Sequence, residues 1–117
     1  MRPSVLIVDD HAEFRRAARA LLDAEGYDVV GEAVDGESAM REARRLRPAL
    51  VVLDIHLPDV DGFEIAARLA AEPDPPGVVL TSSRAVTAYR RRLATTTALG
   101  FIPKSQLSRD ALSALGA

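Results

Sequence analysis

The chain has 117 residues, the size of a single domain, and 48% of them are hydrophobic and 27% charged, as in ordinary globular proteins. It contains no cysteine, which excludes a disulfide scaffold, thiolate metal ligands and a cysteine nucleophile. A formal net charge of −2 argues against direct contact with nucleic acid, and no apolar run approaches the roughly 18 residues of a membrane span. We therefore expect one cytoplasmic domain over residues 1–117 that contacts neither nucleic acid nor a membrane.

Short runs rich in valine, isoleucine and leucine alternate along the chain with longer segments of helical periodicity. The runs predict strands, in chain order, at residues 5–8, 27–34, 49–53, 77–80 and 100–102. A helix is expected after each strand, with apolar residues recurring every three or four positions. The residues expected to face the core are, helix by helix, Phe14, Ala17, Ala18, Leu21 and Leu22; Ala39, Met40, Ala43 and Leu46; Phe63, Ala66, Ala67 and Ala70; Val86, Tyr89 and Leu93; and Leu107, Ala111 and Leu115.

Local signals mark several helix ends. Asp35 is the expected N-cap of the second helix, which Pro48 stops, and Ser105 or Ser108 can cap the last one. His11 is expected in the first turn of the first helix. Three threonines at residues 95–97 predict a weak end for the fourth helix, because threonine has low helix propensity.

Five strand–helix pairs in strict alternation predict an α/β fold with a parallel sheet. The strands are apolar throughout, as expected when helices cover both faces of the sheet. Five pairs are too few for an eight-stranded barrel, so the sequence favours an open, doubly wound, five-stranded sheet.

Polar residues follow four of the five predicted strands. The first is followed by Asp9 and Asp10, the third by Asp54, the fourth by Thr81, and the last by Lys104. In an open α/β sheet these strand ends lie along one edge, where ligands bind. Lys104 is also the only lysine among fifteen basic residues, which suggests that this position requires a lysine.

Three converging carboxylates repel one another unless a cation or protonation relieves them, and oxygen ligands suit Mg²⁺. An aspartate can also serve as a nucleophile that forms an acyl phosphate, whose oxygens an ammonium and a hydroxyl would stabilise. Each residue alone has an ordinary structural explanation, such as a helix cap or a loop carboxylate. The pattern by itself therefore leaves a magnesium-dependent phosphoryl site and a structural arrangement both open.

Four segments together carry a resemblance to a known family. They are residues 5–11, 52–62, 79–82 and 100–104, and their order and spacing agree with their expected places on strands and loops. In these segments the chain resembles the receiver domain of bacterial two-component response regulators, along essentially its whole length. The resemblance implies a flavodoxin-like sheet with the strand order 2-1-3-4-5.

The resemblance also implies a phosphorylation site and a metal site. Asp54 would accept a phosphoryl group from a histidine kinase or a phosphotransfer protein. Mg²⁺ would be the cofactor, bound by the side chains of Asp10 and Asp54 and by the backbone carbonyl of His56. Asp9 would bind it through water. The domain would then be a signalling domain that promotes its own phosphorylation and dephosphorylation, not an enzyme acting on other substrates.

Three further residues receive roles from the same resemblance. Lys104 would pair with Asp54 and later with the phosphoryl oxygens. Thr81 would move to donate a hydrogen bond to the phosphoryl group, and Phe101 would be the switch aromatic that rotates into the space Thr81 leaves. Phosphorylation would thereby bias the surface of the fourth helix, the fifth strand and the fifth helix towards an output or homodimer state.

Two features depart from the commoner pattern. Ser105 follows Lys104 where many receivers have a proline, and Phe101 lacks the hydroxyl of the commoner tyrosine. The run at residues 101–105 resembles receivers joined to LuxR-type DNA-binding output domains. No output domain is expected within residues 1–117, and we expect this chain to be one part of a longer protein more readily than a stand-alone receiver.

Other features allow more than one interpretation. His56 is either an exposed loop residue or a side chain that tunes the lifetime of the acyl phosphate. Arg90, Arg91 and Arg92 form either a solvated helix face or a docking and dimerisation surface. Two alternative functions are a phosphatase that uses Asp54 as a transient nucleophile and a pseudo-receiver that only binds proteins. Such phosphatases place a second acid where this chain has His56, and a pseudo-receiver would normally lack an acid or the lysine.

Overall fold

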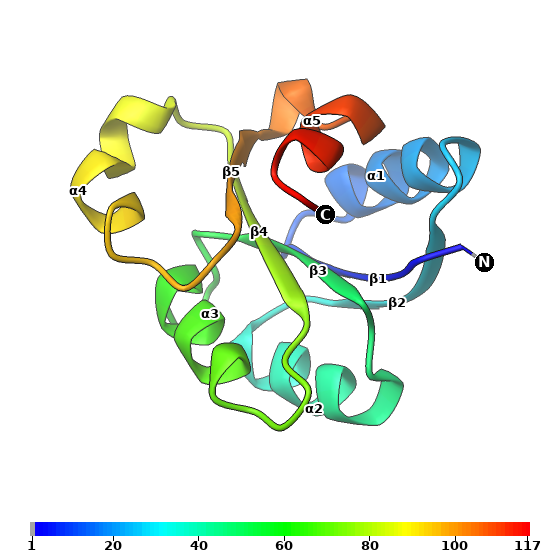
Figure 1. The fold of residues 1–117 in the computed structure, drawn as a ribbon, viewed down its shortest axis with the longest axis horizontal. Coiled ribbons are helices and arrows are strands. Elements are labelled where there is room, and N and C mark those ends of the chain that lie inside the picture. Colours follow the sequence, from blue (N-terminus) through cyan, green and yellow to red (C-terminus); the bar gives the residue numbers. More distant parts are fainter. Residues whose placement is uncertain (1) are drawn as a thin grey trace.

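The computed structural model describes residues 2–117 and contains the predicted alternation of strands and helices (Figure 1). The strands are β1 (Ser4–Val8), β2 (Asp28–Ala33), β3 (Leu50–Asp54), β4 (Gly77–Ser82) and β5 (Gly100–Pro103). The helices are α1 (Ala12–Ala24), α2 (Gly36–Leu46), α3 (Gly62–Ala70), α4 (Arg90–Leu93) and α5 (Arg109–Ala114). Two 3₁₀ turns, η1 (Val86–Tyr89) and η2 (Lys104–Gln106), precede α4 and α5. No helix within residues 2–117 is long and apolar enough to cross a membrane.

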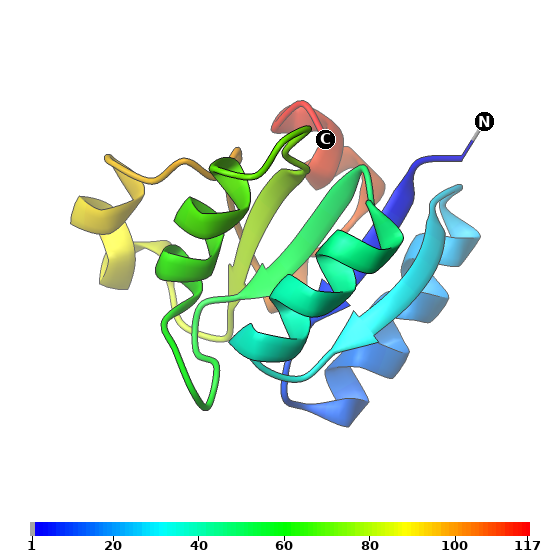
Figure 2. The same cartoon turned by 90° about the horizontal axis from the view of Figure 1, so that it is seen from below.

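The five strands form one parallel sheet in the order β2-β1-β3-β4-β5, which confirms the expected doubly wound α/β fold. Helices cover both faces (Figures 1 and 2). One apolar cluster lies under α1 and α5 and includes Leu22 and Leu112, while the other lies under α2 and α3 and reaches Tyr89 at the end of η1. The central strands are buried on both sides, so their carboxyl ends are held rigidly at one edge of the sheet.

Two predicted helix caps are present in the structure. The Asp35 side chain accepts a hydrogen bond from the Ser38 N–H at 2.8 Å, and the hydroxyl of Ser38 reaches back to the Asp35 N–H. Ser108 caps α5, because its hydroxyl accepts a hydrogen bond from the Ala111 N–H at 3.0 Å. His11 differs from the prediction: it is the extended N-cap residue of α1 and lies just outside the first turn.

The predicted core face of the third helix was only partly right: Ala66 is buried and Phe63 half-buried, but the other two predicted residues are not in the core. Ile65, Ala66 and Leu69 are buried, whereas Ala67 and Ala70 are exposed. Burying isoleucine and leucine removes more apolar surface from water than burying alanine, so the helix turns its larger side chains inward. Ala17 in α1 is also exposed, because α1 turns Ala18 and Leu22 towards the sheet.

The fourth helix is shorter than its apolar spacing suggested. The segment is divided into the 3₁₀ turn η1 and the four-residue helix α4, and Val86 is exposed. Three threonines, at residues 95–97, follow Ala94 at the end of α4, and their low helix propensity agrees with its early end. Of residues 83–94, only Tyr89 is buried.

Candidate functional site

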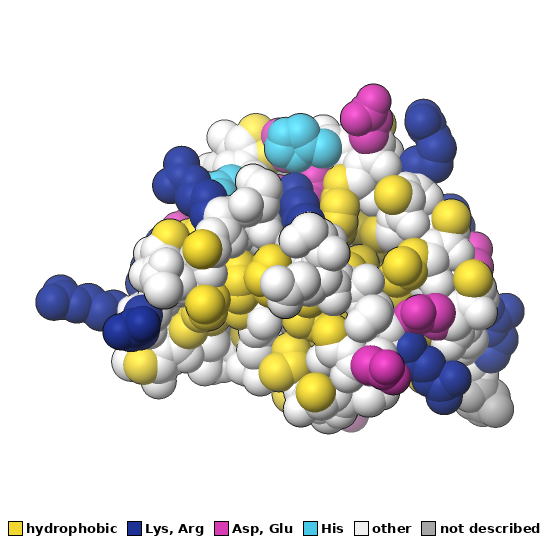
Figure 3. All heavy atoms as spheres, turned by 90° about the horizontal axis from the view of Figure 1, so that it is seen from above, with side chains coloured by type: hydrophobic (Ala, Val, Ile, Leu, Met, Phe, Trp, Pro, Cys, Tyr) yellow, Lys and Arg dark blue, Asp and Glu magenta, His cyan; other side chains and the backbone are white. Residues whose placement is uncertain are grey.

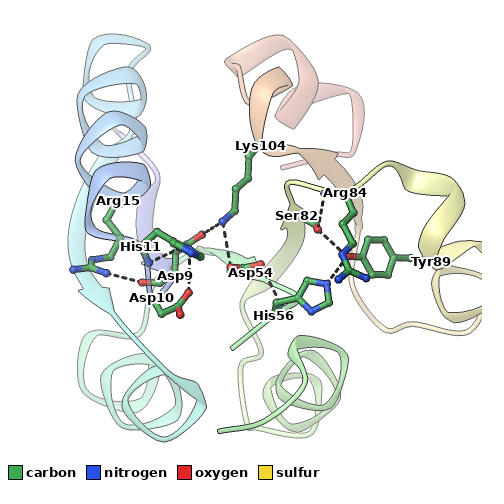
Figure 4. A network of polar contacts seen from close by, with 10 residues as sticks. All are labelled: Asp9, Asp10, His11, Arg15, Asp54, His56, Ser82, Arg84, Tyr89 and Lys104. Carbon is green, nitrogen blue, oxygen red and sulfur yellow. Dashed lines mark hydrogen bonds and ion pairs between the residues drawn. The ribbon is translucent and has the colours of Figure 1, made fainter. Parts of the chain in front are cut away.

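The carboxyl ends of β1, β3, β4 and β5 bring the expected polar residues to one edge of the sheet (Figure 4). Asp9, Asp54 and Thr81 are all buried there, and Asp54 pairs directly with Thr81 in the register of β3 and β4. Lys104 begins the turn after β5 and extends towards both aspartates. The sheet topology therefore joins residues that are up to 95 positions apart in the sequence, from Asp9 to Lys104.

Lys104 supplies the positive charge at the centre of the site. Its Nζ atom lies 2.6 Å from Asp9 Oδ2 and 3.2 Å from Asp54 Oδ2, and its side chain is only 15% exposed. The ammonium also lies 4.8 Å from the centre of the Phe14 ring, which covers it from α1. Lys104 thus bridges the two buried carboxylates, with Asp9 as its nearer partner.

The second oxygen of each buried aspartate accepts a backbone hydrogen bond. Asp9 Oδ1 accepts from the His11 N–H at 2.8 Å, and Asp54 Oδ1 accepts from the His56 N–H at 3.0 Å. In both cases the donor lies two residues after the aspartate, in the loop that follows the strand. Arg15 adds a further constraint by donating to the Asp9 carbonyl oxygen at 2.7 Å. Both carboxylates are therefore fixed in orientation before any ligand binds.

The environment shifts the pKa values of two of these groups. Burial raises the pKa of Asp54, and the charge of Asp9 adds to this, while the His56 N–H and Lys104 lower it in part. Burial by itself lowers the pKa of Lys104, but the contact with Asp9 and the charge of Asp54 outweigh it, so that this pKa is raised. Lys104 is therefore charged at neutral pH, and Asp54 carries a desolvated carboxylate.

A cluster of possible metal ligands lies beside the lysine. One ligand atom from each of Asp9, Asp10, His11 and Asp54 falls within 4.8 Å of the others. Three carboxylates share this volume with a single lysine, so a hard cation fits the charge and the oxygen donors. His11 was not predicted as a member of the cluster, although its place directly after the acidic pair was the available signal.

Thr81 lies on β4 beside Asp54, and Phe101 lies on the neighbouring strand β5. The hydroxyl of Thr81 is fully buried and has no hydrogen-bond partner within residues 2–117. A buried hydroxyl without a partner is costly unless a ligand or a conformational change satisfies it. Phe101 is half-buried, and its ring centre lies 5.6 Å from that of Tyr89.

The chain's only two histidines, His11 and His56, lie on the surface around the site. Figure 3 shows these side chains beside acidic and basic groups along one rim of the molecule, with hydrophobic side chains exposed across the same face. Both histidines are exposed, so the loops that carry them are open to solvent. The buried carboxylates therefore lie directly beneath an accessible rim.

His56 differs from a simple exposed loop residue. Its Nε2 atom shares a hydrogen bond of 2.5 Å with the hydroxyl of Tyr89, which shares another of 2.8 Å with the hydroxyl of Ser82. From the sequence, Tyr89 was expected only to face the core, and Ser82 was assigned no role. The position of Ser82 directly after Thr81, at the functional edge, was the one signal that could have pointed to it.

Replacing Asp54 with asparagine is expected to stabilise the fold. Because the pKa of Asp54 is raised above its ordinary value of 3.8, its ionised form costs stability at neutral pH, and this cost disappears as the pH falls towards that value. We expect Asp54→Asn to raise the free energy of unfolding near pH 7, measured by urea denaturation. The stabilities of the two proteins should converge near pH 4.

The matched control for this substitution is Asp23→Asn, at an exposed position of α1, which should change stability by less than about 0.5 kcal/mol. A less stable Asp54→Asn protein at neutral pH would contradict the assignment of a desolvated carboxylate.

Comparison with known proteins matches the sequence of this chain to a family. Residues 5–115 match the response regulator receiver domain family. The positive transcription regulator of virulence factors BvgA, from Bordetella pertussis, is 37% identical over 114 residues, which are 97% of this chain and 54% of BvgA. A protein-glutamate methylesterase/protein-glutamine glutaminase of Anaeromyxobacter dehalogenans is 41% identical over 90 residues, 76% of this chain and 26% of that protein. The chain spans about half the length of BvgA and less of the methylesterase.

Solved structures agree with the fold. The signal receiver domain of the response regulator NarL from Mycobacterium tuberculosis has a TM-score of 0.85 and 29% identity, covering 99% of this chain and 98% of that one. A LuxR-family response regulator from Aurantimonas sp. has a TM-score of 0.86 and 26% identity, covering 99% of this chain and 84% of that one. The strand order of this chain is thus that of a receiver fold.

Proposed function

Because the chain belongs to the family of response regulator receiver domains, we propose that it is a phosphorylatable switch of a two-component system, with Asp54 as the phosphoacceptor. The observation that carries this proposal is the buried Asp54 carboxylate, held between the His56 N–H and the Lys104 ammonium. Phosphorylation would add roughly −1.5 to −2 charge and three acceptor oxygens at this edge. Such a local change can bias a surface that has two conformations.

The proposed donor is a phosphohistidine of a histidine kinase or a phosphotransfer protein. A carboxylate oxygen of Asp54 attacks the phosphorus, and the phosphorus–nitrogen bond breaks with its electron pair going to the departing imidazole. Lys104 lies 3.2 Å from Asp54 Oδ2, where its charge would offset that of the transferred oxygens. The unpartnered Thr81 hydroxyl would donate a hydrogen bond to one of them.

We propose Mg²⁺ as the cofactor. Asp10 and Asp54 would bind it by their side chains, the His56 backbone carbonyl would be a further ligand, and Asp9 would bind through water. The bound cation would offset the charges of the carboxylates and of the transferring phosphoryl group. The close cluster of Asp9, Asp10 and Asp54 supports this proposal.

The proposed output surface consists of α4, β5 and α5. Arg90 and Arg91 are exposed there, while Arg92 contacts Asp61 at 2.6 Å and lies 4.2 Å above the Phe63 ring. BvgA is a transcription regulator, and one structural relative is a LuxR-family regulator, so we propose a DNA-binding output domain outside residues 1–117. In this proposal the receiver itself contacts no nucleic acid, acts in the cytoplasm, and docks either a second copy or the output domain.

The test is the intact mass of the protein after incubation with Mg²⁺ and acetyl phosphate. We expect one added phosphoryl group, about 80 Da, in the unchanged protein and none after Asp54→Asn. The addition should also disappear when the Mg²⁺ is chelated. An unmodified protein with an intact fold would contradict the proposed switch and leave the pseudo-receiver, whereas sustained hydrolysis of phosphomonoesters would favour the phosphatase.

A further inference from the structure

Tyr89 occupies an unusual position between the candidate site and the α4 surface. Its side chain is only 5% exposed, and its hydroxyl shares hydrogen bonds with His56 Nε2 at 2.5 Å and with Ser82 Oγ at 2.8 Å (Figure 4). Its ring packs against His56, Phe63 and Phe101, with ring centres 5.8, 6.2 and 5.6 Å away. Tyr89 therefore has both a polar and an apolar attachment to the rest of the domain.

The two hydroxyl partners lie on either side of the proposed phosphoacceptor. His56 donates its backbone N–H to Asp54 Oδ1, and Ser82 directly follows Thr81, the residue paired with Asp54 across the sheet. Ser82 also accepts a hydrogen bond from the Arg84 N–H at 3.0 Å, at the start of the segment that leads to η1. A continuous set of hydrogen bonds thus runs from Asp54 through His56 and Tyr89 to this segment.

The same segment depends on Tyr89 for its attachment. Tyr89 is the one buried residue between positions 83 and 94, and α4 contains no buried residue. Apart from Tyr89, which directly precedes it, α4 is attached to the domain by the half-buried Leu93 and by the contacts of Arg92 with Asp61 and Phe63. A change in the partners of the Tyr89 hydroxyl would therefore alter the position or mobility of residues 83–94.

We propose that Tyr89 is a positioning residue that couples occupancy of the Asp54 site to the conformation of residues 83–94. The inference rests on the proposed phosphorylation of Asp54. A phosphoryl group would take over the hydrogen bond of the His56 N–H and draw on the hydroxyl of Thr81, so both neighbours of the Tyr89 hydroxyl would shift. The Tyr89 ring also packs against Phe101, so a shift of Tyr89 would be felt on β5.

The first test removes the hydroxyl and keeps the ring. In Tyr89→Phe, amide hydrogen exchange of residues 86–93 should be about five- to tenfold faster, as expected for the loss of a buried hydrogen-bonded attachment. The matched control is Tyr27→Phe, because Tyr27 is also 5% exposed and its hydroxyl makes no hydrogen bond within residues 2–117. Equal exchange of this segment in the two variants would overturn the proposal.

The second test asks whether Tyr89 responds to the site. The chain has two tyrosines and no tryptophan, so in Tyr27→Phe the tyrosine fluorescence comes from Tyr89 alone. Quenching of this emission by acrylamide should be weak at first and should rise severalfold after treatment with Mg²⁺ and acetyl phosphate. The same treatment should leave the quenching unchanged when Asp54→Asn is added. A merely structural role of Tyr89 predicts no change in quenching in either protein.

The mass of each sample separates the two hypotheses. A phosphorylated protein with unchanged Tyr89 quenching would overturn the coupling and leave the proposed function intact. A protein that takes no phosphoryl group would contradict the proposed function, and the coupling would fall with it.

Discussion

Lys104→Met is expected to lower the free energy of unfolding by about 3 kcal/mol near pH 7. The substitution removes the one ammonium that contacts both Asp9 and Asp54, and both carboxylates are buried. Two desolvated negative charges would then face each other without a counter-charge, whereas methionine retains the apolar stem of the side chain against Phe14. Urea denaturation followed by circular dichroism measures this change.

The control for Lys104 is Arg16→Met, which also removes one positive charge. Arg16 is exposed in α1 and has no ion pair in the part of the chain that the structure describes, so the expected change is below about 0.5 kcal/mol. Mg²⁺ should restore part of the stability lost in Lys104→Met, because a bound cation can offset the same carboxylates. Equal losses in the two variants would refute the central role of Lys104.

The contribution of Lys104 also has a defined pH dependence. Its pKa in the folded chain is raised above the ordinary value of 10.5, so its stabilising effect is fully present below that pH and is lost as the pH rises through the raised pKa. The difference in stability between the unchanged protein and Lys104→Met should therefore be constant between about pH 7 and 9 and shrink above pH 10.5. A difference that already shrinks below pH 9 would contradict this assignment.

Gly62→Ala is expected to lower the free energy of unfolding by about 2–3 kcal/mol and to displace Asp54. A Cβ atom at this position would lie 2.4 Å from the Asp54 carbonyl oxygen and 2.7 Å from the Ile55 Cα. These are backbone atoms of β3 and the residue after it, so they cannot rotate away as a side chain can. The loss should exceed the helix propensity that alanine gains over glycine, about 1 kcal/mol.

Gly36→Ala is the matched control, since Gly36 begins α2 as Gly62 begins α3. There the added Cβ would meet only side-chain atoms, of Val60 and Ile65, which can adjust their rotamers. We expect a clearly smaller loss of stability, measured by thermal and urea denaturation. The affinity for Mg²⁺, measured by calorimetry, should fall more in Gly62→Ala, because only that substitution moves the backbone of Asp54. Similar losses in both variants would show that the close approach of α3 to β3 is not the limiting contact.

The proposed switch depends on a narrow set of contacts. Asp54 is held by one backbone N–H and one ammonium, and the segment from residue 83 to 94 is held mainly by one buried tyrosine. A switch requires two arrangements that differ by only a few kcal/mol, and a segment with few buried contacts has the low local stability that allows a second arrangement. In the proposed function, the rigid sheet positions the chemistry and the weakly attached α4 segment responds to it.

The sequence alone determined the features that follow from local periodicity and from strand ends. Alternating apolar runs and helical segments predicted the doubly wound sheet, and the residue after each strand predicted which groups meet at its edge. The N-caps at Asp35 and Ser108 were predictable for the same reason, because each cap bonds to a backbone group three residues away. Where periodicity was ambiguous, as in α3, the choice of Ala67 and Ala70 over Ile65 and Leu69 was wrong.

Only the tertiary structure decided the contacts between distant segments. The hydrogen bond between His56 and Tyr89 joins residues 33 positions apart, and the nearer partner of Lys104 is Asp9, 95 positions away in the sequence. Such pairs depend on how the loops close over the sheet edge and on which side chains compete for the same space. No local pattern records that competition, so it is the packing of η1 against the loop after β3 that makes Tyr89 a partner of His56 and not merely a core residue.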